Sequence, residues 1–234
     1  MREVNLKVGL TPKHQCSYLP NRQEQLLVLL DKDLLCPEGY EQLLSAGFRR
    51  SGSDIYRPHC QLCHACESLR IDVARFTPSR SQKRIKRQNQ DLSVSLSEQE
   101  KPEYFRLYQR YINERHQDGA MYPASRQQYD GFLLCDWLPP VFMEFRLDQQ
   151  LVAVAVTDLL GHALSAMYTF YDPALEHRSL GTFAILSQLE LASGLNKSWV
   201  YLGYQVDDCK KMNYKQHFRP HQRLVAGHWQ AMKD

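Results

Sequence analysis

Three cysteines at two-residue spacing are the feature of this chain with the clearest chemistry. Cys60, Cys63 and Cys66 form a Cys-x-x-Cys-x-x-Cys run. This spacing lets neighbouring thiolates turn onto one ion, and their softness favours zinc or an iron–sulfur cluster. Because a closed structural site needs four ligands, His59, His64 and Cys16 are candidates for the fourth, and we favour Cys16. Structural or redox-active thiols without a metal are the alternative interpretation of the run.

A second feature is the basic segment from residue 70 to residue 90, which holds seven basic residues against one acidic residue. Within it, Ser79 is placed to cap a helix whose first turns carry basic side chains on one face. Hydroxyl groups, free amides and cations at a helix start suit phosphate groups. The sequence therefore predicts a phosphate-binding surface that contains Ser79, Arg80, Lys83 and Arg84. An exposed, solubilising helix face would show the same pattern.

A junction between a predicted strand and a predicted helix has the composition of a substrate site. Residues 168–173 end the strand, Gly181 and Thr182 begin the helix, and Arg178 lies just before it. In coenzyme A-dependent N-acetyltransferases, bare amides at such a junction hold the coenzyme pyrophosphate. Phe183 stands where those enzymes carry a small residue, and we expect its ring to obstruct this approach.

A fourth feature combines aromatic and basic residues near the C-terminus. Residues 201–204 predict the end of a strand, and Lys210 and Lys211 lie in a predicted helix over 207–216. Aromatic rings beside lysines combine base stacking with phosphate contacts, which predicts binding of a nucleic acid. Strand packing and a solvated helix face are the alternative interpretation.

The elements that must position these groups follow an α/β order. The patterns predict helices over 37–47, 100–116, 125–134 and 181–194, and strands over 93–96, 141–147, 151–158, 163–171, 198–204 and 223–229. Residues 24–30 are predicted to form a buried strand or a short helix. Short connections make the three strands from 141 to 171 antiparallel. This order predicts an N-acetyltransferase-like mixed sheet with flanking helices. We place a boundary near residue 90, between a smaller cysteine-containing region (1–90) and an acyltransferase-like domain (91–234).

Composition excludes several classes of protein. The chain has 234 residues, 43% of them hydrophobic, and a net charge of +3, which is ordinary for a globular protein and excludes disorder, collagen and coiled coil. No apolar run reaches the length of a membrane span, and the N-terminus lacks an export signal. We therefore expect a cytoplasmic protein whose thiols are free or metal-bound.

Eight segments together resemble one family, the aminoacyl-tRNA–protein transferases, and within it the bacterial leucyl-transferase branch. The segments are 16–20, 47–52, 56–66, 76–84, 168–173, 179–182, 201–204 and 210–215. The resemblance implies transfer of leucine from leucyl-tRNA to proteins with N-terminal Asp or Glu, within the N-degron pathway of protein degradation. An arginyl-tRNA donor or a coenzyme A-dependent N-acetyltransferase is the alternative. A zinc-containing nucleic-acid-binding module would explain only the cysteines and the basic segment.

The implied reaction starts from an activated ester, so it requires neither a covalent nucleophile nor a cofactor. We expect catalysis by positioning of the amine and by stabilisation of the oxyanion and the leaving ribose oxygen. Tyr168 or Tyr204 would donate to the leaving oxygen, and Asp172 would orient the amine or receive its proton. The acidic residue of the acceptor needs a cation, for which Arg70, Arg178 or a C-terminal lysine is a candidate.

Overall fold

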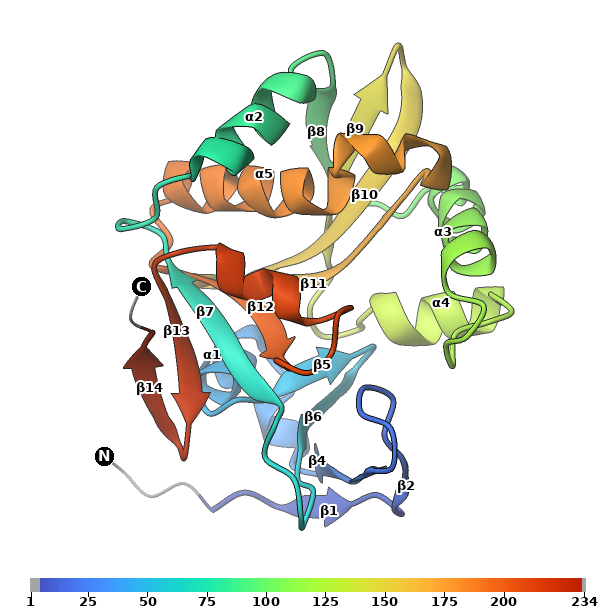
Figure 1. Cartoon of the computed structure of the whole chain (residues 1–234). Helices are drawn as coiled ribbons and strands as arrows, with labels where there is room; N and C mark the ends of the chain where they lie inside the picture. The colour runs from blue at the N-terminus through green and yellow to red at the C-terminus, as the bar shows by residue number, and fades with distance from the viewer. Residues whose placement is uncertain (1–4, 233–234) are drawn as a thin grey trace.

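A large mixed sheet organises the chain. The computed structural model describes residues 5–232. Within them, one sheet has the strand order β14-β13-β7-β12-β11-β10-β9-β8 (Figure 1). Its strands are β7 (Glu67–Asp72), β8 (Ser93–Ser97), β9 (Val141–Leu147), β10 (Gln150–Leu159), β11 (Ala163–Tyr171), β12 (Trp199–Gln205), β13 (His221–Val225) and β14 (His228–Ala231). The mixed α/β class predicted from the sequence is therefore confirmed.

Three consecutive hairpin-connected strands form the middle of this sheet, as the sequence predicted. β9, β10 and β11 pair antiparallel in order. The turn between β9 and β10 places Asp148 and Gln149 at positive φ, 46° and 68°, as a tight two-residue hairpin requires. Along β10 the side chains alternate in direction, with Val154 and Val156 in one apolar cluster and Ala153 and Ala155 in another. Both faces of the sheet are therefore buried at this strand.

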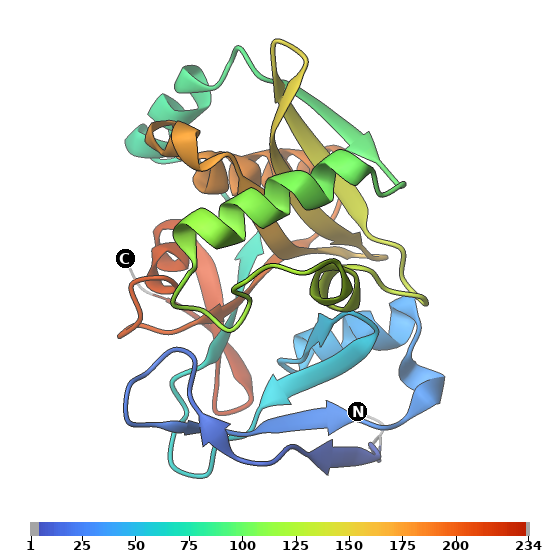
Figure 2. The same ribbon diagram turned by 90° about the vertical axis from the view of Figure 1, so that its right-hand side faces the viewer.

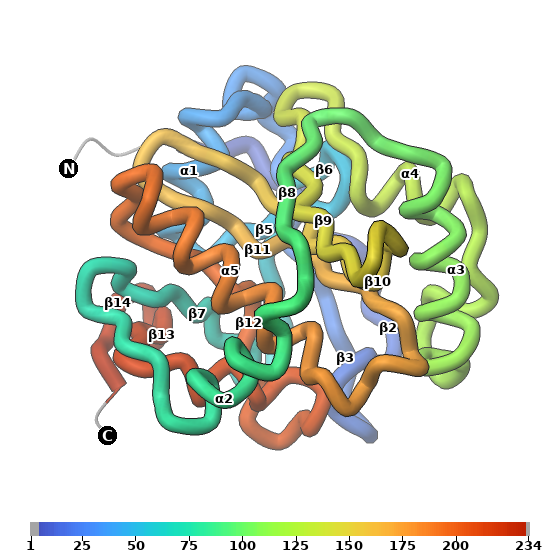
Figure 3. Tube along the Cα trace, turned by 90° about the horizontal axis from the view of Figure 1, so that it is seen from above, coloured from blue at the N-terminus to red at the C-terminus, as the bar shows by residue number. Residues whose placement is uncertain are grey.

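Helices cover the two faces of the sheet. One face carries α2 (Arg80–Gln88) and α5 (Leu180–Gly194), which contact each other, and the other carries α3 (Pro102–Arg115) and α4 (Arg126–Leu133). Figure 3 shows these two layers on either side of the strands. Small alanines of β10 allow α5 to approach closely, and Phe183 of α5 packs on Phe145 of β9. The predicted helices 100–116, 125–134 and 181–194 are thus found with small shifts at their ends.

A smaller sheet lies below the large one (Figure 2). Its strand order is β1-β4-β6-β5, formed by β1 (Val8–Leu10), β4 (Leu26–Leu29), β6 (Asp54–Pro58) and β5 (Arg49–Ser51). Nearby are the two-stranded pair β2 (His14–Gln15) and β3 (Gln23–Glu24), the short helix η1 (Lys32–Leu34), and α1 (Pro37–Ser45). Cys36 caps α1 and Pro37 occupies its first turn, which explains the predicted helix over 37–47. An apolar cluster joins this region to Leu160, Ala163 and Tyr201 of the large sheet.

The polypeptide passes from the small sheet to the large sheet between β6 and β7. β7 pairs with both β12 and β13, although it precedes residue 90. This strand is not predictable from the sequence pattern, because Glu67, Arg70 and Asp72 interrupt its apolar residues. The boundary near residue 90 stays a prediction about independent folding, but the sheets themselves meet earlier in the chain.

Two C-terminal predictions were wrong. Residues 207–216 do not form a helix; they form turns followed by the short helix η3 (Asn213–His217). Local bonds compete with helix formation there, since the Asn213 side chain donates to the Asp207 carbonyl and Lys215 to the Tyr204 carbonyl. The tail strand over 223–229 is a hairpin of β13 and β14. Ala226 and Gly227 adopt φ values of 49° and 79°, which reverse the chain. Among residues 5–232, no helix is both long and apolar enough to cross a membrane.

Candidate functional site

The parallel strands β11 and β12 pair only at their beginnings and then diverge. Their register runs from Ala163 opposite Trp199 to Ser165 opposite Tyr201 and ends there. α5 connects the two strands, and β12 turns towards β7 through an irregularity between Tyr201 and Gly203. We call the segments that no longer pair with each other, 166–171 of β11 and 202–205 of β12, the β11–β12 fork. Each of them still pairs on its other side, with β10 or β7.

Arg49 of the small sheet reaches into the fork. Its Nη2 donates to the carbonyl oxygen of Ala166, in β11, at 2.9 Å. The residue is 7% exposed, and its buried Nη1 has no hydrogen-bond partner within residues 5–232. Gly203, at φ +80°, lies against the guanidinium: a Cβ there would stand 3.4 Å from Cζ of Arg49. The positive backbone angle favours glycine at 203, and a Cβ there would be in ordinary van der Waals contact with the guanidinium.

Lys215 is the second buried cation of the fork. It is 6% exposed, and its Nζ donates to the Tyr204 carbonyl oxygen at 2.6 Å and contacts Sδ of Met212 at 3.3 Å. Burial lowers the pKa of Lys215 to about 7, and the charge of Arg49 adds to this effect. This burial cannot be predicted from the residue pattern, because Lys215 follows the exposed Lys210 and Lys211 and has the same residue type.

Tyr204, a predicted catalytic residue, lies in the fork with its hydroxyl engaged. The hydroxyl donates to the carbonyl oxygens of Gly47 at 3.0 Å and Tyr56 at 3.4 Å, which ties β12 to the small sheet. Burial raises the pKa of Tyr204 well above its usual value, and Tyr56 adds to the effect. The phenol therefore stays protonated, and its proton is directed at these backbone carbonyls.

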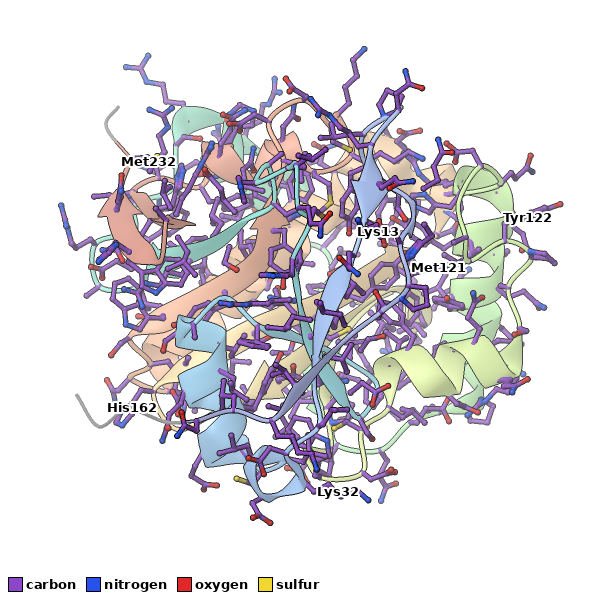
Figure 4. The ribbon with its side chains drawn as sticks, turned by 90° about the horizontal axis from the view of Figure 1, so that it is seen from below. Lys13, Lys32, Met121, Tyr122, His162 and Met232 are labelled. Carbon is purple, nitrogen blue, oxygen red and sulfur yellow. The ribbon has the colours of Figure 1, made fainter. Side chains whose placement is uncertain are left out.

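Tyr168, also predicted to be catalytic, lies on β11 in an aromatic cluster with α3 and α4. Its ring is 6.3 Å from Tyr108, 6.4 Å from Tyr111 and 5.2 Å from Phe132. Burial raises its pKa well above the usual value. The α3–α4 loop closes this side, because the Tyr108 hydroxyl donates to the sulfur of Met121, which is labelled in Figure 4. The Tyr168 phenol therefore also stays protonated. Tyr168 lies on β11, and Tyr204 lies on β12.

Asp172 follows directly at the end of β11, and its carboxylate already has protein partners. It is 6% exposed, accepts from the Ala174 amide at 3.0 Å and pairs with Arg110 of α3. These contacts cap the short helix η2 (Pro173–Arg178). The observed contacts are those of a structural cap, and its predicted role with the amine stays a prediction.

The predicted phosphate site at the start of α5 has a different geometry from the expected one. Arg178 donates to both carboxylate oxygens of Asp91 at 2.8 and 2.9 Å, so its charge is neutralised. Gly181 and Thr182 lie in the first turn of α5, after Ser179 at φ 55°. Phe183 points into the core, where it is 8% exposed. Our expectation that its ring obstructs the junction was therefore wrong.

The basic residues of α2 form an exposed face. Ser79 and Gln82 make the reciprocal capping box that holds the helix start. Arg80, Lys83, Arg84 and Arg87 are exposed, and none of them forms an ion pair within residues 5–232. We call these four residues the α2 basic face.

Of the other cationic side chains predicted to bind a substrate, Lys211 and Arg70 already have partners within the protein. Lys211 pairs with Asp118 at 2.7 Å, while the neighbouring Lys210 is exposed. Arg70 is held between the rings of Trp199 and Trp229, at 3.8 and 4.1 Å. It also donates to Gln222 and Tyr201. Arg70 and Arg178 therefore both have their cationic groups committed within the protein.

The four predicted metal ligands line one cavity of about 810 Å³ beside the fork. Cys16, Cys60, Cys63 and Cys66 share its wall with Tyr204. Burial raises the pKa of Cys66 to about 12, and the other three thiols add to the effect. Within residues 5–232, however, no three His, Cys, Asp or Glu side chains are arranged to hold a metal ion. Metal binding by these thiols stays a prediction, and we derive no step of a reaction through it.

Comparisons with family models and with individual relatives indicate the same kind of transferase. The family described as arginine-tRNA-protein transferase, C terminus, matches residues 103–225, and its N-terminus counterpart matches residues 14–84. The chain is 66% identical to an aspartate/glutamate leucyltransferase from Aeromonas hydrophila, over 97% of this chain and 95% of the relative. It is 52% identical to one from Pseudoalteromonas atlantica, over 97% and 98% of the two chains.

Among solved structures the similarity is more distant. The C-terminal domain of a lysylphosphatidylglycerol synthetase from Agrobacterium fabrum aligns with 84% of this chain and 64% of that chain. The TM-score is 0.49 at 11% sequence identity, which says nothing about activity.

Proposed function

This chain belongs to the arginine-tRNA-protein transferase family, and from that premise we propose that it moves leucine from leucyl-tRNA to the α-amine of proteins with N-terminal Asp or Glu. The protein is accordingly an aminoacyltransferase. The observation that carries the choice of leucine is the 66% identity, over nearly the full length of both chains, to a relative named for leucyl transfer to Asp and Glu. The product would carry the N-terminal leucine that marks proteins for the N-degron pathway.

The balance of the reaction is simple, because the ester bond of leucyl-tRNA is already activated. The neutral α-amine attacks the ester carbonyl, an amide bond forms, and the bond to the ribose oxygen breaks. The amine loses a proton and the ribose oxygen gains one. An α-amine has a pKa near 7.7–8.0 and is partly neutral at cellular pH. The protein must therefore mainly align the two substrates and guide one proton.

The β11–β12 fork is where we place this alignment. We assign hydrogen-bond donation to the leaving oxygen to Tyr168 or Tyr204, since both phenols stay protonated. Tyr204 would have to turn its proton away from the Gly47 and Tyr56 carbonyls to do so, which favours Tyr168. Lys215 is a further candidate to receive the amine proton, because a lysine with a pKa of about 7 is substantially neutral at cellular pH. Asp172 is a weaker candidate, since Arg110 and the Ala174 amide already engage its carboxylate.

The surroundings of the fork support the same assignment. The chain order β9-β10-β11-α5-β12, with the fork between β11 and β12, is what we expect of an N-acetyltransferase-like acyl-transfer domain. We assign tRNA phosphate binding to Ser79 and the α2 basic face, with Lys210 and Lys211 as further contacts. We place Gly181 and Thr182, at the first turn of α5, beside the donor's acyl ester. Because charged tRNA is a cytoplasmic substrate, we propose the cytoplasm as the compartment.

A transfer assay with three labelled donors tests the proposal. The protein is incubated with labelled leucyl-tRNA, arginyl-tRNA or acetyl-coenzyme A and a peptide that begins with Asp, alongside a matched peptide that begins with Ala. We expect label in the Asp peptide from leucyl-tRNA alone. Transfer only from arginyl-tRNA would overturn the choice of donor, and transfer only from acetyl-coenzyme A would overturn the family reaction. Transfer from none, with RNA binding retained, would favour a nucleic-acid-binding module.

A further inference from the structure

Arg49 and Arg50 are the two buried arginines among residues 5–232, and of these two only Arg49 has no acidic partner. Arg50 pairs with Asp158, Arg146 with Glu103 and Glu144, and Arg223 with Glu67 and Asp207. Arg49 forms no ion pair within residues 5–232, although it is 7% exposed. A buried charge without a counter-charge is costly to the folded state. Such a group marks a place where an anion belongs.

The position of Arg49 connects this unpaired charge to the fork. Nη2 is held by the Ala166 carbonyl just beyond the last paired residues of β11 and β12. Gly203 supports the guanidinium from the side of β12, and Arg49 pairs with Tyr56 in the ladder between β5 and β6. Its Nη1 is the donor that no protein group satisfies within the described residues. The charge of Arg49 also reaches Lys215, whose Nζ shares the fork.

We infer that Arg49 binds the side-chain carboxylate of the N-terminal Asp or Glu of the acceptor. This inference rests on the proposed function and names the residue that reads the acceptor. The guanidinium has its Nη2 held by a backbone carbonyl, and its Nη1 still lacks an acceptor within the described residues. A small planar carboxylate fits such a group. The exposed α2 basic face is better suited to tRNA phosphates, which stay in contact with solvent. Arg70 and Arg178, considered earlier for this role, have their groups committed elsewhere.

The same geometry explains how Asn and Gln would be rejected. The amide of Asn has nearly the shape of the Asp carboxylate but carries no charge. In the fork it would leave the buried guanidinium without a counter-charge, which a site built for a carboxylate does not tolerate. We therefore expect the protein to discriminate Asp from Asn mainly through Arg49.

The experiment compares specificity ratios between variants. For the full-length protein, kcat/KM for leucyl transfer is measured with peptides that begin with Asp, Asn, Glu or Gln. In Arg49→Gln the Asp-to-Asn and Glu-to-Gln ratios should fall by about tenfold or more, which is the weight of a charged hydrogen bond. Arg49→Lys should retain part of the preference, because it keeps the positive charge but loses the planar guanidinium group. Arg106→Gln, an exposed arginine of α3, is the matched control and should leave both ratios unchanged.

The ratios separate the competing outcomes. Both peptides meet the same enzyme, so a partly unfolded variant lowers both rates but not their ratio. If Arg49→Gln has no activity, the ratios of Arg49→Lys decide, and they should be several-fold below those of the unchanged protein. Unchanged ratios in an active Arg49 variant would overturn the inference. A raised KM for leucyl-tRNA with unchanged ratios would instead assign Arg49 to a tRNA phosphate. If the unchanged protein transfers leucine to no peptide, the proposed function itself fails, and the inference with it.

Discussion

At the scale of single residues, Lys215 is the group whose chemistry depends most on the fold. Burial lowers its pKa to about 7, whereas an unfolded lysine has a pKa near 10.4. Between these two values the unfolded chain binds a proton that the folded protein does not bind. The free energy of unfolding therefore rises with pH across this range.

This difference predicts a pH dependence that one substitution removes. From pH 7 to pH 9 the unfolding free energy of the unchanged protein should gain on the order of 1–3 kcal/mol more than that of Lys215→Met. Urea unfolding of both proteins at the two pH values measures the gain. Lys32→Met is the control, because that lysine is exposed, and it should follow the unchanged protein. Equal gains in Lys215→Met and the unchanged protein would show that the lysine keeps its proton in the folded state.

The phenol of Tyr168 permits a second test at this scale. If its hydroxyl donates to the leaving ribose oxygen, Tyr168→Phe should slow single-turnover leucyl transfer by about 100-fold, the low end for a positioned acid–base group. Tyr108→Phe is the matched control, since that tyrosine lies in the same aromatic cluster, with its hydroxyl on Met121. Rapid-quench measurement with saturating Asp peptide gives the rate. An unaltered rate in Tyr168→Phe would leave Tyr204 as the remaining donor of the pair.

Asp172 calls for a different expectation. Its carboxylate caps η2 and pairs with Arg110, so Asp172→Ala should lower the unfolding free energy by about 1 kcal/mol through loss of the cap. If the carboxylate also takes part in transfer, the single-turnover rate of the folded variant should fall as well. Urea unfolding and single-turnover transfer on the same preparation separate the two effects. A folded Asp172→Ala with full transfer rate would remove the residue from the mechanism.

At the scale of elements, α2 carries a charge that its neighbours do not neutralise. Only Lys86 on this helix pairs with an acidic side chain within the described residues, Glu190 of α5. The capping box at Ser79 fixes where the helix begins and therefore how the α2 basic face is presented. An exposed helix face of this kind suits a polyanion, whose binding releases condensed cations.

The salt dependence of tRNA binding tests this role of α2. The double variant Lys83→Met, Arg84→Met should weaken binding, and the slope of log K against log salt should fall in magnitude by between about 1 and 2. Fluorescence anisotropy with labelled tRNA, without acceptor peptide, gives both quantities over a salt series. Arg106→Met on α3 removes an exposed charge of the same type and should not change the slope. Identical slopes for the double variant and the control would mean that α2 is a solvated face only.

At the scale of the whole molecule, one buried ion pair fastens the small sheet to the large one. Arg50 of β5 and Asp158 of β10 meet at 2.6 Å with both side chains 0% exposed. Arg50 also donates to the carbonyl oxygens of Gly52 and Leu133. The neighbouring Arg49 enters the fork from the same strand, so this pair also helps to fix the position of the candidate acceptor-binding residue.

Breaking this pair from one side should be costly. Arg50→Met should lower the unfolding free energy by about 3–5 kcal/mol, because it leaves a buried carboxylate without a partner. The double variant Arg50→Met, Asp158→Leu should lose less, since neither charge remains. Lys211→Met, which breaks one exposed pair with Asp118, should cost no more than about 1 kcal/mol. Urea unfolding of the four proteins measures these values, and a double variant no better than Arg50→Met would show that shape rather than charge dominates there.

The sequence by itself determined the elements whose patterns are local. Strands 141–147, 151–158 and 163–171 either alternate between polar and apolar residues or are apolar over their whole length. The helix over 181–194 follows the last of these strands in the chain. The family motifs, such as residues 47–52 and 210–215, also lie within short stretches and pointed to the reaction. Local periodicity needs only the neighbouring residues, so it can be read without knowing the fold.

The tertiary structure alone decided which charges are free. Arg178 meets Asp91, Arg50 meets Asp158 and Lys211 meets Asp118 across long separations in sequence, whereas Arg49 meets no carboxylate within residues 5–232. β7 is a strand because β12 and β13 pair with it, although its own residues alternate poorly. Lys215 resembles its exposed neighbours in sequence, and only the bend after β12 buries it. Burial and ion pairing depend on contacts between distant segments, and for this reason the fold, rather than the residue pattern, selects the cations available to a substrate.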